Sequence, residues 1–334
     1  MSLRKKNRLS IEEYKAGVLS GDRIALSRAI TLVESTLDED NELGARLIDE
    51  LFQYTGNSFR VGITGVPGVG KSTFIESFGS HILDEGKKLA VLTIDPSSQK
   101  TGGSILGDKT RMEKLSQSKN AFIRPSPSGD ALGGVAQKTR ESMLLCEAAG
   151  FDVIFVETVG VGQSETAVKN MVDFFLLLML SGAGDELQGI KKGIMEMADA
   201  IAINKADGNN IEAAKKAKKE YQNALHLFPA NENGWIPKVG ICSALENSGL
   251  SDIWDLLKEF QAQQKESGYF DHNRKEQSIH WMHQTIHHYL KRNFYKSPEI
   301  KENLLKFEDA VRQGDKHSVQ AARLLLENYF NKLS

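Results

Sequence analysis

Short apolar runs alternate with longer amphipathic stretches between about residues 58 and 265. The apolar runs fall at 60–64, 89–95, 121–125, 153–157, 174–180, 200–204 and 239–242. Strands that alternate with helices are typical of a parallel sheet with helices on both faces. The longest run, 174–180, is far shorter than the ~20 residues of a membrane helix, and it follows Asp173, so we interpret it as a buried central strand. The pattern therefore predicts an α/β fold with a mostly parallel central sheet flanked by helices.

The two ends of the chain have a different pattern. Residues 8–55 carry apolar positions at helical spacing, interrupted by Ser20, Gly21 and Asp22. Beyond residue 268 the strand pattern disappears, and charged helical segments follow at 271–295, 299–312 and 317–331. We therefore expect three parts: an N-terminal helical segment at 1–57, an α/β domain at 58–267 and a C-terminal helical segment at 268–334.

Composition narrows the environment and the partners. The 42 basic and 44 acidic residues nearly cancel, with a formal net charge of −2, so no global field favours nucleic acid or an anionic membrane. The two cysteines, Cys146 and Cys242, lack the close Cys or His neighbours of a metal cage and are interpreted as buried, reduced thiols. The basic N-terminus leads into Ile11 and two glutamates rather than into the apolar core of a secretory signal. We expect a cytoplasmic protein.

A glycine-rich segment follows the strand at 60–64 and opens the helix at 73–83. It matches the G-x-x-x-x-G-K-[ST] pattern and comprises Gly65, Val66, Pro67, Gly68, Val69, Gly70, Lys71 and Ser72. We expect the next residue, Thr73, to bind the nucleotide as well. Glycines let backbone N–H groups turn toward phosphate oxygens, and the helix N-terminus favours their negative charge. Lys71 would reach the β and γ phosphates, and Ser72 would ligate magnesium. The segment predicts a phosphate-binding loop for a nucleotide.

A second motif, Asn204-Lys205-Ala206-Asp207, ends the strand at 200–204 and indicates which base is bound. The carboxylate of Asp207 can accept hydrogen bonds from the N1–H and the 2-amino group of guanine, whereas adenine would leave this charged acceptor unpaired, at a cost of about 1–3 kcal/mol or more. By resemblance to GTPases, Asn204 contacts the base edge or braces the phosphate loop, and the stem of Lys205 covers one base face. The loop at Ser243, Ala244 and Leu245 resembles the one whose backbone N–H meets guanine O6. The sequence therefore predicts GTP and GDP as ligands.

Acidic residues near the predicted phosphates are candidate magnesium ligands. Glu157 ends the strand at 153–157, in the place of the aspartate of a D-x-x-G segment, and Gly160 would present its N–H to the γ phosphate. Asp95, at the end of a strand, and Asp108, in a glycine-rich stretch, compete with Glu157 for the metal beside Ser72. We expect the catalytic set to comprise Lys71, Glu157, Gly160 and Asp108, and the residue types leave open which acid binds magnesium directly.

The rate of hydrolysis is predicted from the residue after Gly160. That residue is Val161 rather than a glutamine that could orient water. We therefore expect slow intrinsic hydrolysis that a partner accelerates. GTP is expected to order 101–111, 157–165 and 182–193, so that the partner senses the nucleotide state.

Four stretches, 95–98, 101–112, 157–165 and 182–193, together resemble the MeaB/ArgK GTPases. The resemblance covers most of the chain and implies a P-loop GTPase of the SIMIBI class. It implies a chaperone that gates cobalamin loading and protects an adenosylcobalamin-dependent methylmalonyl-CoA mutase or related acyl-CoA mutase. It also implies a homodimer whose C-terminal helices form a dimerisation arm, and a mutase-facing switch loop at 182–193 with Asp185, Lys191 and Lys192 as coupling residues. Ser181 departs from the pattern, which has proline there.

Other functions stay open at this point. A metallochaperone GTPase of the same class would need a soft or imidazole-rich site, and His280, His283 and His287 share one face of a predicted helix, although no cysteine or carboxylate motif accompanies them. An older label of the resembled family is a kinase of an amino-acid transport system. A kinase would transfer the phosphate to a substrate rather than to water, and the guanine motif argues against it.

Overall fold

The computed structural model describes residues 8–95, 112–127, 132–158, 164–182, 192–229 and 231–331. The chain divides into two compact units, Met1–Gln277 and Ser278–Ser334. The first unit contains the sheet and the second contains only helices among its described residues.

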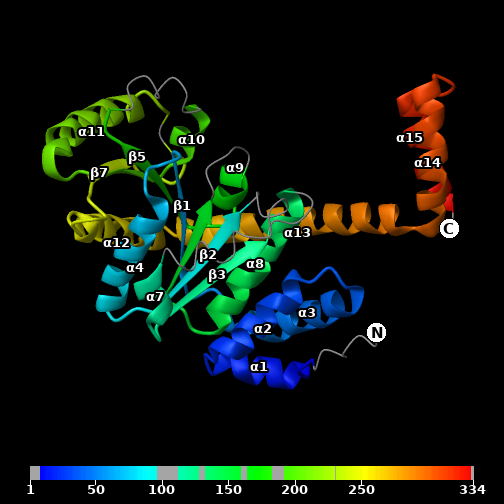
Figure 1. The fold of residues 1–334 in the computed structure, drawn as a ribbon, viewed down its shortest axis with the longest axis horizontal. Helices are drawn as coiled ribbons and strands as arrows, with labels where there is room; N and C mark the ends of the chain where they lie inside the picture. The colour runs from blue at the N-terminus through cyan, green and yellow to red at the C-terminus, as the bar shows by residue number, and fades with distance from the viewer. Residues whose placement is uncertain are drawn as a thin grey trace. The chain divides into compact units, whose positions relative to one another are not determined.

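A seven-stranded sheet forms the centre of the first unit (Figure 1). Its spatial order is β3-β2-β4-β1-β5-β6-β7, and every pairing between neighbouring strands is parallel. The predicted fold class, a mostly parallel sheet flanked by helices, is confirmed. The strands are β1 (Phe59–Gly65), β2 (Leu89–Asp95), β3 (Ala121–Pro127), β4 (Val153–Thr158), β5 (Phe174–Leu180), β6 (Ala200–Asn204) and β7 (Lys238–Ile241).

Helices cover both faces of this sheet. On one face, α4 (Lys71–Asp84), α7 (Glu113–Gln117) and α12 (Leu250–Glu266) contribute to one apolar cluster with β1, β2 and β4. On the other face, α10 (Lys192–Met197) and α11 (Ile211–Leu225) pack on β5 and β6. Leu176 and Leu178 of β5 belong to the first cluster, whereas Leu177 and Met179 belong to the second. This two-sided burial explains why the apolar run at 174–180 is continuous rather than alternating.

The N-terminal helices pack beside α8 (Leu132–Ala148), and α9 (Ser164–Lys169) follows β4. They are α1 (Ile11–Leu19), α2 (Arg23–Glu34) and α3 (Asp38–Leu51), followed by the short helix η1 (Phe52–Tyr54). Ser10 and Glu13 form a capping box at the start of α1, and Asp22 caps α2 by accepting from two backbone N–H groups. The predicted break at 20–22 is therefore a helix end followed directly by a helix start.

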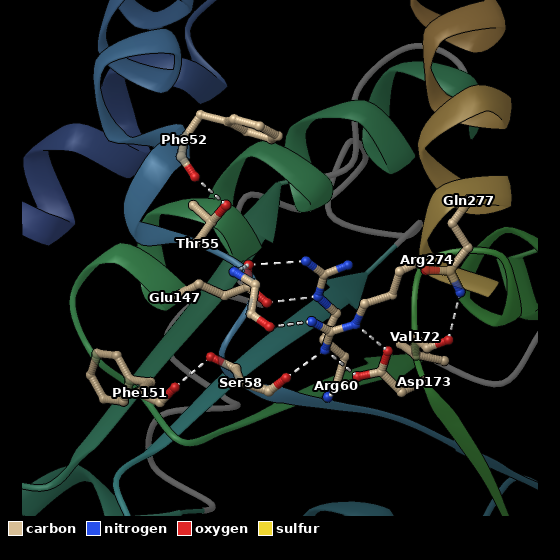
Figure 2. Close-up of polar contacts among 11 residues, drawn as sticks. Phe52, Thr55, Ser58, Arg60, Glu147, Phe151, Val172, Asp173, Arg274 and Gln277 are labelled. Carbon is tan, nitrogen blue, oxygen red and sulfur yellow. Dashed lines mark hydrogen bonds and ion pairs between the residues drawn. The ribbon is translucent and has the colours of Figure 1, made fainter. Parts of the chain in front are cut away.

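A buried polar network connects the amino ends of β1 and β5 to the start of α13 (Tyr269–Lys296) (Figure 2). The guanidinium of Arg60 donates to both carboxylate oxygens of Glu147, at 2.8 and 2.9 Å. Asp173 accepts from the backbone N–H of Arg60 at 2.8 Å and from two guanidinium nitrogens of Arg274 at 2.8 and 2.7 Å. Arg274 also donates to the carbonyls of Gly56 and Ser58. These charges are paired, as burial requires.

The second unit continues α13 and adds α14 (Pro298–Gln313) and α15 (Ser318–Asn331). Ser297 precedes Pro298 at the first helical position of α14, and Gly314 ends that helix with φ 80°. In the part of the chain that the structure describes, no helix is long and apolar enough to cross a membrane.

Candidate nucleotide-binding site

The predicted phosphate-binding loop connects buried β1 to α4 at the carboxyl edge of the sheet. Gly68 and Gly70 have φ 77° and 86°, in the left-handed region that favours glycine. A Cβ at Gly65 would lie 2.6 Å from the carbonyl oxygen of Leu178 on β5, so a side chain cannot fit there. The loop's glycines are therefore required both by its turn and by its close approach to the sheet. Around them, Val69 is fully buried, whereas Pro67 and Thr73 are exposed and Val66 is half-buried.

Lys71 and Ser72 are the first two residues of α4, and both are half-buried. The Nζ of Lys71 donates to the carbonyl of Gly65 at 2.9 Å, so the side chain folds back over the loop. Burial lowers the pKa of Lys71 below its ordinary value, and the negative charges of Glu157 and Glu165 oppose that shift. A phosphate beside Lys71 would favour its charged form in the same way.

Asn204 connects the two predicted nucleotide motifs. Its side chain is 2% exposed, donates from Nδ2 to the carbonyl of Val69 at 2.9 Å, and accepts at Oδ1 from the backbone N–H of Ala244 at 3.1 Å. Lys205 has φ 58° and donates from Nζ to the carbonyl of Gly68 at 2.8 Å. Of the two roles left open for Asn204, this geometry matches the brace on the phosphate loop.

The predicted base-reading residues lie together at the ends of β6 and β7. The hydroxyl of Ser243 donates to a carboxylate oxygen of Asp207 at 2.5 Å and accepts from the backbone N–H of Glu246 at 3.1 Å. Ala244 is 4% exposed, whereas the side chain of Leu245 is 78% exposed. The hydroxyl of Ser77 on α4 donates to the carbonyl of Ala244 at 2.6 Å. Asp207 is thus held by one oxygen, which leaves its other oxygen to accept from a base.

The structure places only some of the predicted magnesium ligands. Glu157 is 5% exposed on β4 and is paired in register with Ile63 of β1, close to the start of the phosphate loop. Asp95 ends β2, but its side chain lies outside the described residues, as do Asp108 and Gly160. Ser72 and Glu157 are therefore the two members of the set whose burial the structure gives. Both belong to elements that end or begin at the carboxyl edge of the sheet, which suits a hard, oxygen-ligated cation beside the phosphates.

Comparison with known proteins decides the family. The sequence model described as "Methylmalonyl Co-A mutase-associated GTPase MeaB" matches residues 26–299. The chain belongs to the MeaB family. The family's description names a GTPase. A relative in Escherichia coli (strain K12), GTPase ArgK, is 50% identical to this chain over 276 residues, which are 83% of each protein. This MeaB-family chain is therefore a P-loop GTPase that binds GTP and GDP.

Two further relatives extend over almost the whole chain. The Mus musculus protein named "Methylmalonic aciduria type A homolog, mitochondrial" is 44% identical over 334 residues, covering 97% of this chain and 80% of that protein. A crystal structure described as a LAO/AO transport system kinase is 38% identical, with a TM-score of 0.75, and the match covers 98% of this chain and 99% of that one. Both matches therefore include the helical ends of this chain as well as its sheet.

Some contacts of this MeaB-family site were not predicted. Glu165 on α9 is 4% exposed and acts on the charge of Lys71. The hydroxyl of Thr158 donates to that of Thr64 at 2.8 Å, joining β4 to β1 directly before the phosphate loop. Glu165 follows a glycine-rich stretch and could have been noticed on that ground. The two threonines carry no sequence signal, because apolar strands commonly contain threonine.

Proposed function

We propose that this GTPase is a chaperone that gates cobalamin loading and protects an adenosylcobalamin-dependent methylmalonyl-CoA mutase or a related acyl-CoA mutase. The observation that carries the proposal is the match to a family described by its association with that mutase. The relative named for methylmalonic aciduria supports the same class of partner. The phosphate loop, braced by the side chain of Asn204, would supply the nucleotide chemistry that such a gate needs.

Different residues of the phosphate loop and of the neighbouring strands would bind the phosphates and magnesium. The backbone N–H groups from Gly65 to Ser72 would hold the β and γ phosphates, and Lys71 would exchange its bond to the Gly65 carbonyl for a phosphate oxygen. Ser72, with Glu157, Asp95 or Asp108, would hold magnesium, which neutralises phosphate charge when bound. Gly160 would report the γ phosphate to the partner.

The carboxylate of Asp207, which accepts a hydrogen bond from the hydroxyl of Ser243, would select the base. Asp207 would accept from guanine N1–H and the 2-amino group, and the backbone N–H groups near Ala244 and Leu245 would meet guanine O6. Lys205, already fixed over the phosphate loop by its bond to Gly68, would cover one face of the base with its stem.

We assign an N-terminal helical segment to 1–57, the GTPase domain to 58–267 and a dimerisation arm to 268–334, in a homodimer. The relative from Mus musculus is named as mitochondrial, and for this chain we propose the cytoplasm. The switch stretches 101–111, 157–165 and 182–193, which lie mostly outside the described residues, would carry the nucleotide state to the mutase.

Hydrolysis without the partner should be slow, because Val161 rather than a water-orienting glutamine follows Gly160. Single-turnover measurement with purified protein tests this. A rate above about 1 s⁻¹, the lower end for kinases, would contradict it.

A transport-system kinase is the second candidate, because the solved relative of 38% identity is described in that way. The two functions differ in the acceptor of the γ phosphate. With GTP labelled at that phosphate, the proposed GTPase releases all of the label as inorganic phosphate, with or without cell extract. Label on a protein or an amino acid, lost in a Lys71→Ala variant, would favour the kinase.

A further inference from the structure

A hydroxyl on the helix that follows the phosphate loop contacts the base-reading loop, residues 243–246. Ser77 is half-buried on α4, the helix that begins at Lys71, and its Oγ donates to the backbone carbonyl of Ala244 at 2.6 Å. The two residues are 167 positions apart, and no sequence pattern connects them. The helix that begins at the predicted phosphates therefore also holds the loop that is predicted to contact the base.

Most backbone N–H groups of the base-reading loop already have acceptors. The N–H of Ser243 donates to a backbone carbonyl at 3.0 Å, and the N–H of Ala244 donates to Oδ1 of Asn204 at 3.1 Å. The N–H of Glu246 donates to the hydroxyl of Ser243 at 3.1 Å. The N–H of Leu245 has no acceptor in the part of the chain that the structure describes. Among the four residues of this loop, only Leu245 therefore has a backbone N–H that can donate to a ligand.

The bond from Ser77 determines where this free N–H points. The carbonyl of Ala244 and the N–H of Leu245 belong to the same peptide unit, which is planar and trans, so the two groups point in opposite directions. Because the carbonyl points toward α4, the N–H of Leu245 points away from that helix. A peptide unit in a loop can rotate about its neighbouring dihedrals unless a hydrogen bond holds it. The hydroxyl of Ser77 thus fixes the orientation of a donor that it does not itself contact.

Aromatic packing holds the helix that carries Ser77. The next residue, Phe78, is 0% exposed, and its ring stacks on that of Phe155 of β4 with centroids 5.6 Å apart. The ring of Phe78 also meets the edge of Trp254 on α12, at 6.3 Å, and α12 is the helix that follows the base-reading loop. The hydroxyl and the loop therefore belong to elements that pack against each other, which suits a bond that must keep its geometry.

We propose that Ser77 is a positioning residue for guanine recognition, because it orients the Ala244–Leu245 peptide so that the N–H of Leu245 donates to O6 of the base. This inference rests on the proposed base selection, in which Asp207 accepts from the N1–H and the 2-amino group. Guanine presents an acceptor at O6, whereas adenine presents an amino donor at the same position. A fixed N–H there favours guanine and opposes adenine, independently of the carboxylate of Asp207.

The test compares two nucleotides on the full-length chain: GDP and the diphosphate of 2-aminopurine riboside, which keeps the 2-amino group but lacks O6. Ser77→Ala removes the hydroxyl and introduces a good helix former, so the fold should be kept. Its GDP affinity should fall about threefold to tenfold, because the Ala244 carbonyl loses its donor and the peptide can rotate. Its affinity for the 2-aminopurine nucleotide should change by less than about twofold, because that base has no O6 to lose.

Ser80→Ala is the matched control. Ser80 is half-buried on the same helix, and its hydroxyl donates to the carbonyl of Glu76 within α4 at 2.8 Å, so both nucleotide affinities should be unchanged. Urea unfolding shows that each variant is folded before titration. If the original protein binds both nucleotides equally well, the proposed base selection itself fails. If the original protein prefers GDP but Ser77→Ala binds GDP within about twofold of it, or loses affinity for both nucleotides equally, the positioning role of Ser77 is wrong.

Discussion

Removal of the Asn204 side chain should weaken guanine-nucleotide binding, because this side chain joins the phosphate loop to the base-reading loop. Asn204→Ala leaves two backbone groups without a partner, the carbonyl of Val69 and the N–H of Ala244, and these two residues are buried, at 0% and 4% exposed. An unsatisfied buried group costs about 1–3 kcal/mol, so the pair costs about 2–6 kcal/mol. Each 1.4 kcal/mol is tenfold in an equilibrium constant, and we expect GDP affinity to fall at least about tenfold.

The assay is titration with a fluorescent GDP analogue, together with urea unfolding, since the loss divides between affinity and stability. Asn223→Ala, an exposed asparagine on α11, is the matched control and should change neither quantity. If Asn204→Ala binds GDP within about twofold of the original protein and loses less than about 0.5 kcal/mol of unfolding free energy, the bridging role is wrong.

Asp207, Arg274 and Cys242 can each be tested by a single change. Asp207→Asn should weaken GTP binding by about 1–3 kcal/mol, because the side-chain amide can place an N–H against the N1–H or the 2-amino group of guanine, which are also donors. The variant should instead favour xanthosine triphosphate, whose base has an oxygen in place of the 2-amino group. Competition titrations with the two nucleotides measure both effects. Arg274→Met leaves Asp173 buried without its cation and should lower the free energy of unfolding in urea by about 3–5 kcal/mol, with GDP affinity unchanged because the pair lies at the opposite edge of the sheet. Burial raises the pKa of the Cys242 thiol to about 12, so iodoacetamide at pH 8.5 should alkylate Cys242 only after unfolding.

The cysteine also predicts a pH dependence of stability. The unfolded thiol loses its proton near its ordinary pKa of 9.0, whereas the folded thiol keeps its proton to about pH 12. The stability contributed by this difference is therefore fully present below about pH 9 and is lost as the pH rises toward 12. Cys242→Ala should reduce the fall in stability over this range, and an unchanged slope would contradict the assigned burial effect.

Controls separate these effects from general damage. Asp252→Asn, an exposed acid on α12, should leave the GTP preference unchanged, and Lys275→Met, an exposed neighbour on α13, should leave stability within about 0.5 kcal/mol. An Asp207→Asn protein that still prefers GTP would exclude Asp207 as the base reader. An Arg274→Met protein of unchanged stability would show that the Asp173 pair is dispensable.

Local patterns were sufficient to predict the sheet and the phosphate loop. The run at 174–180 predicted a central strand because a strand buried on both faces is apolar throughout, and β5 packs against both apolar clusters. The phosphate loop was predictable because its chemistry requires glycines, a lysine and a hydroxyl at fixed spacing next to a strand and a helix.

Contacts between distant residues were not predictable in the same way. Asn204 and Val69 are 135 positions apart, and two roles for Asn204 remained open until the fold placed these residues together. Arg274 and Asp173 are 101 positions apart, and single charged residues carry no periodic signal that would pair them. Sequence patterns report local geometry, whereas these contacts depend on the topology of the whole sheet.

GTP binding by this chain should control cobalamin loading of a mutase. The most direct test measures the rate at which adenosylcobalamin enters a purified methylmalonyl-CoA mutase in the presence of this protein with GTP, with GDP, or with a GTP analogue that is not hydrolysed. The loading rate should depend on the nucleotide, and this dependence should disappear with Lys71→Ala. A loading rate that is the same with all three nucleotides, or that still responds to GTP with Lys71→Ala, would contradict this prediction.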